Sequence, residues 1–180
     1  MKLLCDLTPE ELVALLKEYG QPAFRAKQIF GHISSGRELD EMSNVPKELI
    51  RRLKEDDWRA LGLKIEQSYT SAIDGTVKYL YALGDGNIIE GVLMRYKYGN
   101  TLCVSTQVGC AMGCRFCAST LGGLVRDLTA GEILSQVIVV NALNTDGDKR
   151  GVTNVVLMGS GEPLDNYDNV TKFLDLLSLE

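Results

Sequence analysis

The sequence predicts an α/β protein, in which parallel βα units follow a β-meander extension and a small N-terminal helical domain. Apolar residues recur at helical spacing through the first 60 residues. Runs rich in β-forming residues, separated by turn signals, follow between residues 63 and 107. From residue 101 onward, strand-like and helix-like segments alternate, as they do in proteins with parallel sheets. We therefore expect domains at 1–60, 63–100 and 101–180.

The N-terminal domain is predicted to hold three short helices. Thr8 and Glu11 form a capping box, with a proline at the first helical position. The second helix is expected from about residue 22 to residue 34, and the third within the stretch NVPKELIRRLKEDDW. We expect His32, the only histidine, to lie on the surface of the second helix without a catalytic role.

The middle of the chain is predicted to form an antiparallel meander. Turn signals at 74–75, 84–86 and 98–100 separate the runs TVKYLYAL, NIIEGVLMRYK and TLCVSTQV. Because such short turns join neighbouring antiparallel strands, the runs should pair in order and lead into a strand at about 101–106.

The last third of the chain is predicted to form parallel βα units. Thr129 and Glu132 form a second capping box that opens a helix, and the apolar run 152–158 is typical of a buried parallel strand. Since parallel strands end at the same edge of a sheet, the loops after 101–106 and 152–158 should lie close together. Two parallel strands bury little apolar surface, so we expect this chain to be a fragment of a longer protein.

Composition sets limits on the class of protein. The 180 residues are 45% hydrophobic with a net charge of −5, and no apolar run is long enough for a membrane span. Residues 91–126 contain no Asp or Glu but four cations, which are Arg95, Lys97, Arg115 and Arg126. Charge alone favours ordinary solvated faces for this stretch, and a surface facing phosphates is the functional alternative.

Four of the five cysteines lie in the stretch LCVSTQVGCAMGCRFCAST. Cys110, Cys114 and Cys117 have the spacing C-x-x-x-C-x-x-C, which allows three thiolates to ligate a 4Fe–4S cluster and leaves one iron open. A zinc site completed by Cys103 is the alternative, which this spacing disfavours. Cys5 is isolated and is expected to be a partly buried thiol without a role.

Two further sets of candidate residues lie outside the cysteine stretch. Period-two alternation places Glu90 on the more apolar face of its strand, where desolvation would make the carboxylate a stronger base. The residues alone favour a hidden salt bridge or an edge position for Glu90 over catalysis. Gly161 and Glu162 follow the run 152–158, where a glycine exposes backbone groups to a ligand and the carboxylate could meet an ammonium group.

Three stretches, TLCVSTQVGCAMGCRFCAST, TNVVLMGSGEPLDNYDNV and LTPEELVALLKEYGQPAFRAKQIF, resemble the RlmN/Cfr family of radical S-adenosylmethionine (radical SAM) RNA methyltransferases, and RlmN more than Cfr. The resemblance extends over essentially the whole chain. It implies that 101–180 are the first part of a radical-SAM βα barrel and that 1–60 contact RNA.

The resemblance also implies roles for the cysteines. Cys110, Cys114 and Cys117 match the ligands of a 4Fe–4S cluster whose open iron binds S-adenosylmethionine. Cys103 matches a cysteine that is not a ligand. In the family this thiol resolves a covalent intermediate between protein and RNA by forming a transient disulfide bond.

Three other residues match the family by position. Glu90 stands 13 residues before Cys103 and matches the acceptor of the proton from the adenine carbon under attack. Gly161 and Glu162 match the motif that holds the methionyl part of S-adenosylmethionine. The family's second catalytic cysteine, which carries the methyl group, has no counterpart in these residues, so we expect this chain to be inactive alone.

The implied activity is methylation of carbon 2 of adenosine in 23S rRNA and in tRNA, beside the anticodon. The resemblance implies a monomeric cytoplasmic enzyme that receives electrons from a donor such as flavodoxin or ferredoxin. Cfr-like methylation of carbon 8 is the alternative enzymatic activity. A zinc-stabilised RNA-binding module without radical chemistry is the alternative from a different class.

Overall fold

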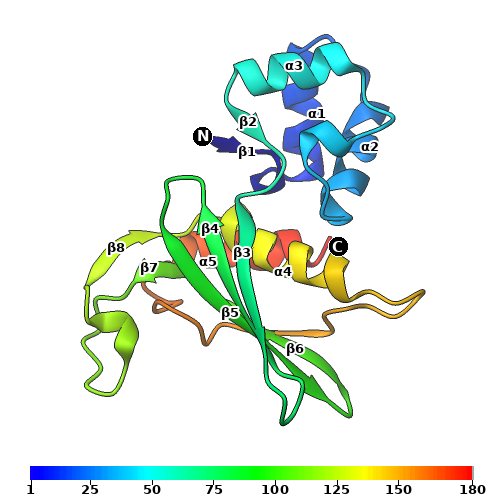
Figure 1. Ribbon diagram of the computed structural model, residues 1–180. Helices are drawn as coiled ribbons and strands as arrows, with labels where there is room; N and C mark the ends of the chain where they lie inside the picture. The colour runs from blue at the N-terminus through cyan, green and yellow to red at the C-terminus, as the bar shows by residue number, and fades with distance from the viewer. Residues whose placement is uncertain (180) are drawn as a thin grey trace.

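The computed structural model describes residues 1–179 and combines a group of small helices with a five-stranded sheet (Figure 1). Helices α1 to α3 lie at one end of the sheet, and the two later helices, α4 (Ala130–Asn144) and α5 (Tyr167–Leu177), pack against each other. The cysteine-bearing segment projects beside β7 and β8, away from the N-terminal helices. No helix within residues 1–179 is long and apolar enough to cross a membrane.

The three predicted N-terminal helices are present as α1 (Pro9–Glu18), α2 (Phe24–Ser34) and α3 (Lys47–Glu55). The first capping box is confirmed, since Thr8 Oγ1 accepts the Glu11 N–H at 3.2 Å and the Glu11 carboxylate accepts the Thr8 N–H at 2.8 Å. Apolar side chains from all three helices form their shared core, including Leu12, Leu16, Ile29, Ile33, Leu49 and Leu53.

Two short strands that the sequence analysis did not predict join the N-terminus to the end of α3. Strand β1 (Lys2–Leu3) pairs in parallel with β2 (Trp58–Arg59). The N-terminal ammonium group also contacts the Asp57 carboxylate at 2.6 Å. Single-turn 3₁₀ helices at Leu4–Asp6 and Leu39–Glu41 complete this part of the chain.

Two predictions of side-chain exposure are wrong. His32 is only 8% exposed, and its ring nitrogens lie 2.6 Å from Asn44 Oδ1 and 3.3 Å from Arg37 Nη1. The segment before α3 covers this ring, which the periodicity of α2 does not reveal. Cys5 is fully buried rather than partly buried, with its Sγ 3.4 Å from Ser135 Oγ on α4, and burial raises the pKa of the thiol to about 12.

The predicted meander is confirmed in a sheet of order β3–β4–β5–β6–β9. Its first four strands pair antiparallel, and β6 then pairs in parallel with β9. Both parallel strands are shorter than predicted, because β6 ends at Cys103 and β9 includes only three residues. The bounds are Leu63–Thr70, Val77–Leu83, Ile88–Tyr96, Gly99–Cys103 and Asn154–Val156.

The two faces of this sheet differ in exposure. One face carries buried side chains such as Tyr81, Leu93 and Leu102. Helix α4 lies on this face, since Asn144 donates a hydrogen bond to Tyr79 Oη at 3.2 Å. The opposite face carries the alternate, half-exposed side chains. This second face is called the open face below.

A second unpredicted pair of strands surrounds the cysteines. Strand β7 (Gln107–Gly109) pairs antiparallel with β8 (Leu124–Asp127), so the two ends of the intervening loop meet. The chain then enters α4 through the second predicted capping box. Thr129 Oγ1 accepts the Glu132 N–H at 3.2 Å, and the Glu132 carboxylate accepts the Thr129 N–H at 3.0 Å.

We predict that Phe173→Ala lowers the free energy of unfolding by about 3–5 kcal/mol, because this side chain is fully buried in α5. The matched control is Leu174→Ala, next to it on α5, where 51% exposure limits the loss to about 0.5 kcal/mol. Urea unfolding followed by circular dichroism measures both values. Equal losses would contradict the packing of α5.

Candidate functional site

The segment between β7 and β8, residues 110–123, is called the cysteine loop, and backbone contacts fix its two ends against each other. Gly109 has a φ of +75°, and a Cβ atom there would lie 2.0 Å from the Gly123 carbonyl oxygen. The Cys110 N–H donates to the same Gly123 oxygen at 3.1 Å. Only glycine fits at position 109, so the chain before and after the loop closes tightly at this point.

The three predicted cluster ligands share this loop and differ in burial. Cys110 is buried, Cys114 is exposed and Cys117 is half-buried, and all five cysteines of the chain are free thiols. Within residues 1–179, no three His, Cys, Asp or Glu side chains are gathered closely enough to hold a metal ion. The structure therefore places the three thiols in one loop without bringing them to ligand positions. Three soft thiol donors are nevertheless the set that iron–sulfur clusters use.

Glu90 and Cys103 lie on the same face of neighbouring strands. In the register between β5 and β6, Cys103 pairs with Val92, which is two residues from Glu90 along β5. Residues two apart in a strand point to the same side, so both side chains lie on the open face. Lys78, on β4, also lies on this face and contacts the Glu90 carboxylate at 2.5 Å.

The predicted desolvation of Glu90 is wrong. Its side chain is 47% exposed, as is that of Lys78. The alternation in the sequence placed the correct residues on one face. However, α4 covers the other face of β5, the one that carries Ile89 and Leu93. The salt bridge that the sequence suggested as an alternative is present, but it is accessible to solvent.

The Cys103 thiol is partly desolvated at the end of β6. Burial raises its pKa above the ordinary value, the Met158 backbone N–H opposes this effect, and the Glu90 charge adds to it. At neutral pH the side chain is therefore mainly a thiol rather than a thiolate.

The glycine-rich loop, residues 157–166 after β9, is joined to the segment after β6, as the parallel strand order predicted. The Thr106 and Gln107 N–H groups both donate to the Ser160 carbonyl oxygen, at 2.8 and 3.1 Å. Ser160 Oγ also lies 3.1 Å from Ser119 Oγ in the cysteine loop. The expected proximity of the two loops is confirmed.

Gly161 and Glu162 occupy a tightly packed part of this loop. Gly161 has a φ of +106°, and a Cβ atom there would lie 2.7 Å from Thr106 Oγ1. One Glu162 carboxylate oxygen accepts the Leu164 N–H at 3.0 Å, so this side chain shapes its own loop. Packing alone is thus a sufficient reason for glycine at position 161.

The sequence analysis missed three polar residues that connect the parts of this site. Ser105, Thr106 and Gln107 are at most 1% exposed, although they stand between an apolar strand and a surface loop. Ser105 Oγ donates to the Glu90 carbonyl oxygen at 2.7 Å and accepts the Ser160 N–H at 2.9 Å. The signal that could have revealed them is a run of three polar residues directly after a buried strand. Polar groups that continue a buried strand need hydrogen-bond partners, so such a run indicates a hydrogen-bonded junction.

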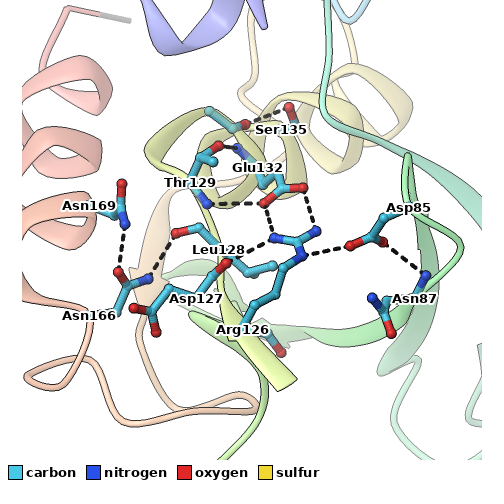
Figure 2. Close-up of polar contacts among 12 residues, drawn as sticks. Asp85, Asn87, Arg126, Asp127, Leu128, Thr129, Glu132, Ser135, Asn166 and Asn169 are labelled. Atoms are coloured by element: carbon cyan, nitrogen blue, oxygen red, sulfur yellow. Dashed lines mark hydrogen bonds and ion pairs between the residues drawn. The ribbon is translucent and has the colours of Figure 1, made fainter. Parts of the chain in front are cut away.

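An ionic contact fixes β8 to the start of α4 (Figure 2). The Arg126 guanidinium donates to both Glu132 carboxylate oxygens, at 2.8 and 2.9 Å, and to Asp85 at 2.6 Å. This contact holds the pKa of the Asp85 carboxyl at about 2. The exit of the cysteine loop is therefore joined to α4 and to the turn between β4 and β5.

These contacts change the interpretation of the basic stretch 91–126. Arg126 is neutralised by two carboxylates, and Arg95 donates to Asn144 Oδ1 at 2.9 Å. Arg115 is exposed in the cysteine loop. Arg126 therefore has a structural function, since both of its ionic partners are carboxylates of the protein.

Comparison with known families agrees with this arrangement. Residues 104–180 match the model of the radical SAM superfamily, and residues 3–57 match that of the ribosomal RNA large subunit methyltransferase N-terminal domain. Members of the radical SAM superfamily use a 4Fe–4S cluster and S-adenosylmethionine. The fold and the cysteine loop thus define a radical SAM protein.

The relatives narrow the assignment further. A Clostridium beijerinckii protein named "Probable dual-specificity RNA methyltransferase RlmN" is 57% identical over the whole of this chain and 50% of its own length. A protein of the same name from Clostridium perfringens is 55% identical, again over the whole chain and 51% of its own length. The chain belongs to the RlmN family, and it spans about half the length of the curated relatives that it matches.

A solved structure has the same fold. The crystal structure of a radical SAM methyltransferase from Sphaerobacter thermophilus superimposes with a TM-score of 0.90 at 38% identity. The match covers 98% of this chain and 52% of that protein.

We predict that Arg126→Ala destabilises the chain by about 3 kcal/mol, because it leaves the Glu132 carboxylate, only 4% exposed, without its ionic partner. The control is Lys54→Ala, which removes a solvent-exposed ion pair with Asp40 and should cost less than about 1 kcal/mol. Both are measured by urea unfolding. A loss for Arg126→Ala no larger than that for the control would refute the structural function of the arginine.

We predict that Cys103 reacts slowly with iodoacetamide at neutral pH, since its raised pKa leaves little thiolate. Glu90→Gln removes one cause of that rise, so the rate should increase and its pH profile should move to lower pH. Glu66→Gln on β3 is the control and should leave the profile unchanged. Peptide mass spectrometry measures the rate at each pH. An unchanged profile for Glu90→Gln would show that the two side chains do not interact.

Proposed function

We propose that this chain forms the cluster-binding part of an RNA methyltransferase that modifies carbon 2 of adenosine in 23S rRNA and in tRNA beside the anticodon. The observation that carries the proposal is the junction of the cysteine loop with the glycine-rich loop, at Ser119 and Ser160. A cofactor that contacts a cluster and a glycine-rich backbone at once needs these two loops side by side. The relatives are named dual-specificity RNA methyltransferases, which supports RNA as the substrate.

Cys110, Cys114 and Cys117 would hold the 4Fe–4S cluster, and the Gly161 backbone and the Glu162 carboxylate would contact the methionyl part of S-adenosylmethionine. The chemistry that the bound cofactors supply is reductive cleavage of the sulfonium, which generates a radical. The exposure of Cys114 suits a ligand that must be reached by iron during assembly.

Glu90 is proposed to accept the proton from the adenine carbon. Its position on the open face and its half-exposed carboxylate allow a substrate to reach it. Lys78 holds the carboxylate in place through their ion pair until the substrate enters. The proposed function therefore depends on the open face rather than on burial of the acid.

Cys103 is proposed to resolve the covalent protein–RNA intermediate by forming a transient disulfide bond with a second cysteine. Its raised pKa keeps the side chain a thiol at rest. Glu90 lies on the same face, two residues along β5 from the partner of Cys103, so both candidate side chains face the same substrate.

The remaining assignments concern the protein as a whole. We propose that residues 1–60 are a domain that contacts RNA, that 63–100 form an extension, and that 101–180 begin the radical SAM core. The protein is further proposed to be a monomer that receives electrons from a flavodoxin or ferredoxin. Free thiols at all five cysteines suit a reducing compartment such as the cytoplasm.

The cluster is tested by anaerobic reconstitution of the chain with iron and sulfide. We expect a brown protein with absorption near 400 nm and about four irons per chain, whose reduced EPR spectrum changes when S-adenosylmethionine is added. Cys114→Ala should lose the cluster, whereas the control Cys5→Ala should keep it because Cys5 is buried against α4. A colourless protein with one zinc ion would contradict the proposal.

The methylated carbon is tested in the host organism. Deleting the gene should remove 2-methyladenosine from digested 23S rRNA and tRNA, as measured by liquid chromatography and mass spectrometry. Loss of 8-methyladenosine instead would assign the alternative Cfr-like activity.

A further inference from the structure

The Gln107 side chain connects its own strand, β7, to two other segments of the site, which are β8 and the glycine-rich loop. Its Oε1 accepts the Glu162 N–H at 2.9 Å, in the glycine-rich loop. Its Nε2 donates to Asp127 Oδ1 at 2.8 Å, on the strand that leaves the cysteine loop, and to Asp165 Oδ2 at 3.1 Å. The side chain is fully buried, and every hydrogen-bonding position of its amide group except one acceptor lone pair is used.

An amide is the side chain that these partners require. The Glu162 N–H needs an acceptor, and the Asp127 and Asp165 carboxylates both need donors. A carboxylate at position 107 would repel the two aspartates, and an apolar residue would leave a buried N–H unpaired. These contacts therefore link the end of the cysteine loop, at Asp127, to the glycine-rich loop, at Glu162 and Asp165.

The segment after β6 also holds Ser160, the residue before Gly161 in the glycine-rich loop. The Ser160 carbonyl accepts two backbone N–H groups and its own N–H donates to Ser105 Oγ, so its backbone has no capacity left for a ligand. Within residues 1–179, the Gly161 N–H and C=O make no hydrogen bond to protein. Thr106 Oγ1, buried and unpartnered, lies directly beside Gly161. The Gly161 backbone therefore stays available to a ligand.

We propose that Gln107 is a positioning residue, which fixes the glycine-rich loop relative to the cysteine loop so that the Gly161 backbone is presented to S-adenosylmethionine. This inference rests on the proposed function, because it concerns the same site. Gln107 itself does not touch the cofactor. It acts through the Glu162 N–H and through the Asp127 and Asp165 carboxylates.

The first test compares Gln107→Ala with Gln136→Ala. Gln136 is a matched control because it is also fully buried and bonds both the N–H and the C=O of Ser105, at 2.9 and 2.8 Å, without reaching either loop. Hydrogen exchange of the metal-free chain is followed by mass spectrometry. Gln107→Ala should speed exchange about tenfold in peptides covering 109–123 and 157–166, whereas Gln136→Ala should leave these peptides within about twofold of the unsubstituted chain.

The second test uses the reconstituted protein. Gln107→Ala should keep its iron content but bind S-adenosylmethionine about tenfold more weakly, as judged by titration of the EPR change. A residue that served only to stabilise the fold would lower the iron content and the affinity together. Unchanged exchange for Gln107→Ala, or an equal increase for Gln136→Ala, would overturn the positioning role. If the unsubstituted protein binds no S-adenosylmethionine while exchange separates the two variants, the proposed function fails, although Gln107 still fixes the glycine-rich loop against the cysteine loop.

A third test reverses the donors and acceptors. Gln107→Glu alone should be as damaging as Gln107→Ala, because it places a third carboxylate beside Asp127 and Asp165. Adding Asp127→Asn and Asp165→Asn supplies two amide donors to that carboxylate, while the Glu162 N–H keeps an acceptor. This triple variant should recover slow exchange in the glycine-rich loop. Failure to recover it would show that these hydrogen bonds do not hold the loop.

Discussion

The hydrogen bonds that continue the β6–β9 pairing beyond the ends of both strands are the constraint on which this site depends. The Val104 N–H donates to Val156, the Gly159 N–H donates back to Val104, and Thr106 and Gln107 then donate to Ser160. Parallel strands end at one edge of a sheet, but only these added contacts fix the two loops against each other. The cysteine loop and the glycine-rich loop therefore act as one structural unit, although about 40 residues separate them in the sequence.

Buried polar side chains extend this unit to the open face of the sheet. Ser105 joins the backbone of Glu90 to Ser160, so the strand with the acidic candidate and the loop with the cofactor candidates share one hydrogen-bonded centre. On the far side, Arg126 joins the exit of the cysteine loop to α4 and to Asp85. A polar group buried in this way stabilises only if every partner is present, which makes the geometry specific.

Local signals in the sequence predicted the elements well, and non-local contacts explain the errors. The capping boxes at Thr8 and Thr129 depend on residues three positions away, and both are present. Alternation correctly grouped the residues of β5, but it could not show which face α4 would cover, so Glu90 was wrongly expected to be desolvated. His32 and Arg126 were misjudged for the same reason, because their partners come from separate turns or strands. The spacing of the cysteines predicted the loop, whereas the β7–β8 pair that closes it rests on strands too short to be recognised.

The central claim is that the two loops form one unit before any cofactor binds. Nuclear Overhauser spectroscopy on the metal-free chain tests it most directly. We predict cross-peaks between the side-chain protons of Ser119 and Ser160, and between the Glu162 amide proton and the Gln107 side chain, because these groups are in contact. Absence of these cross-peaks, in a sample that shows the Leu102–Val155 contacts of the β6–β9 pair, would contradict the claim.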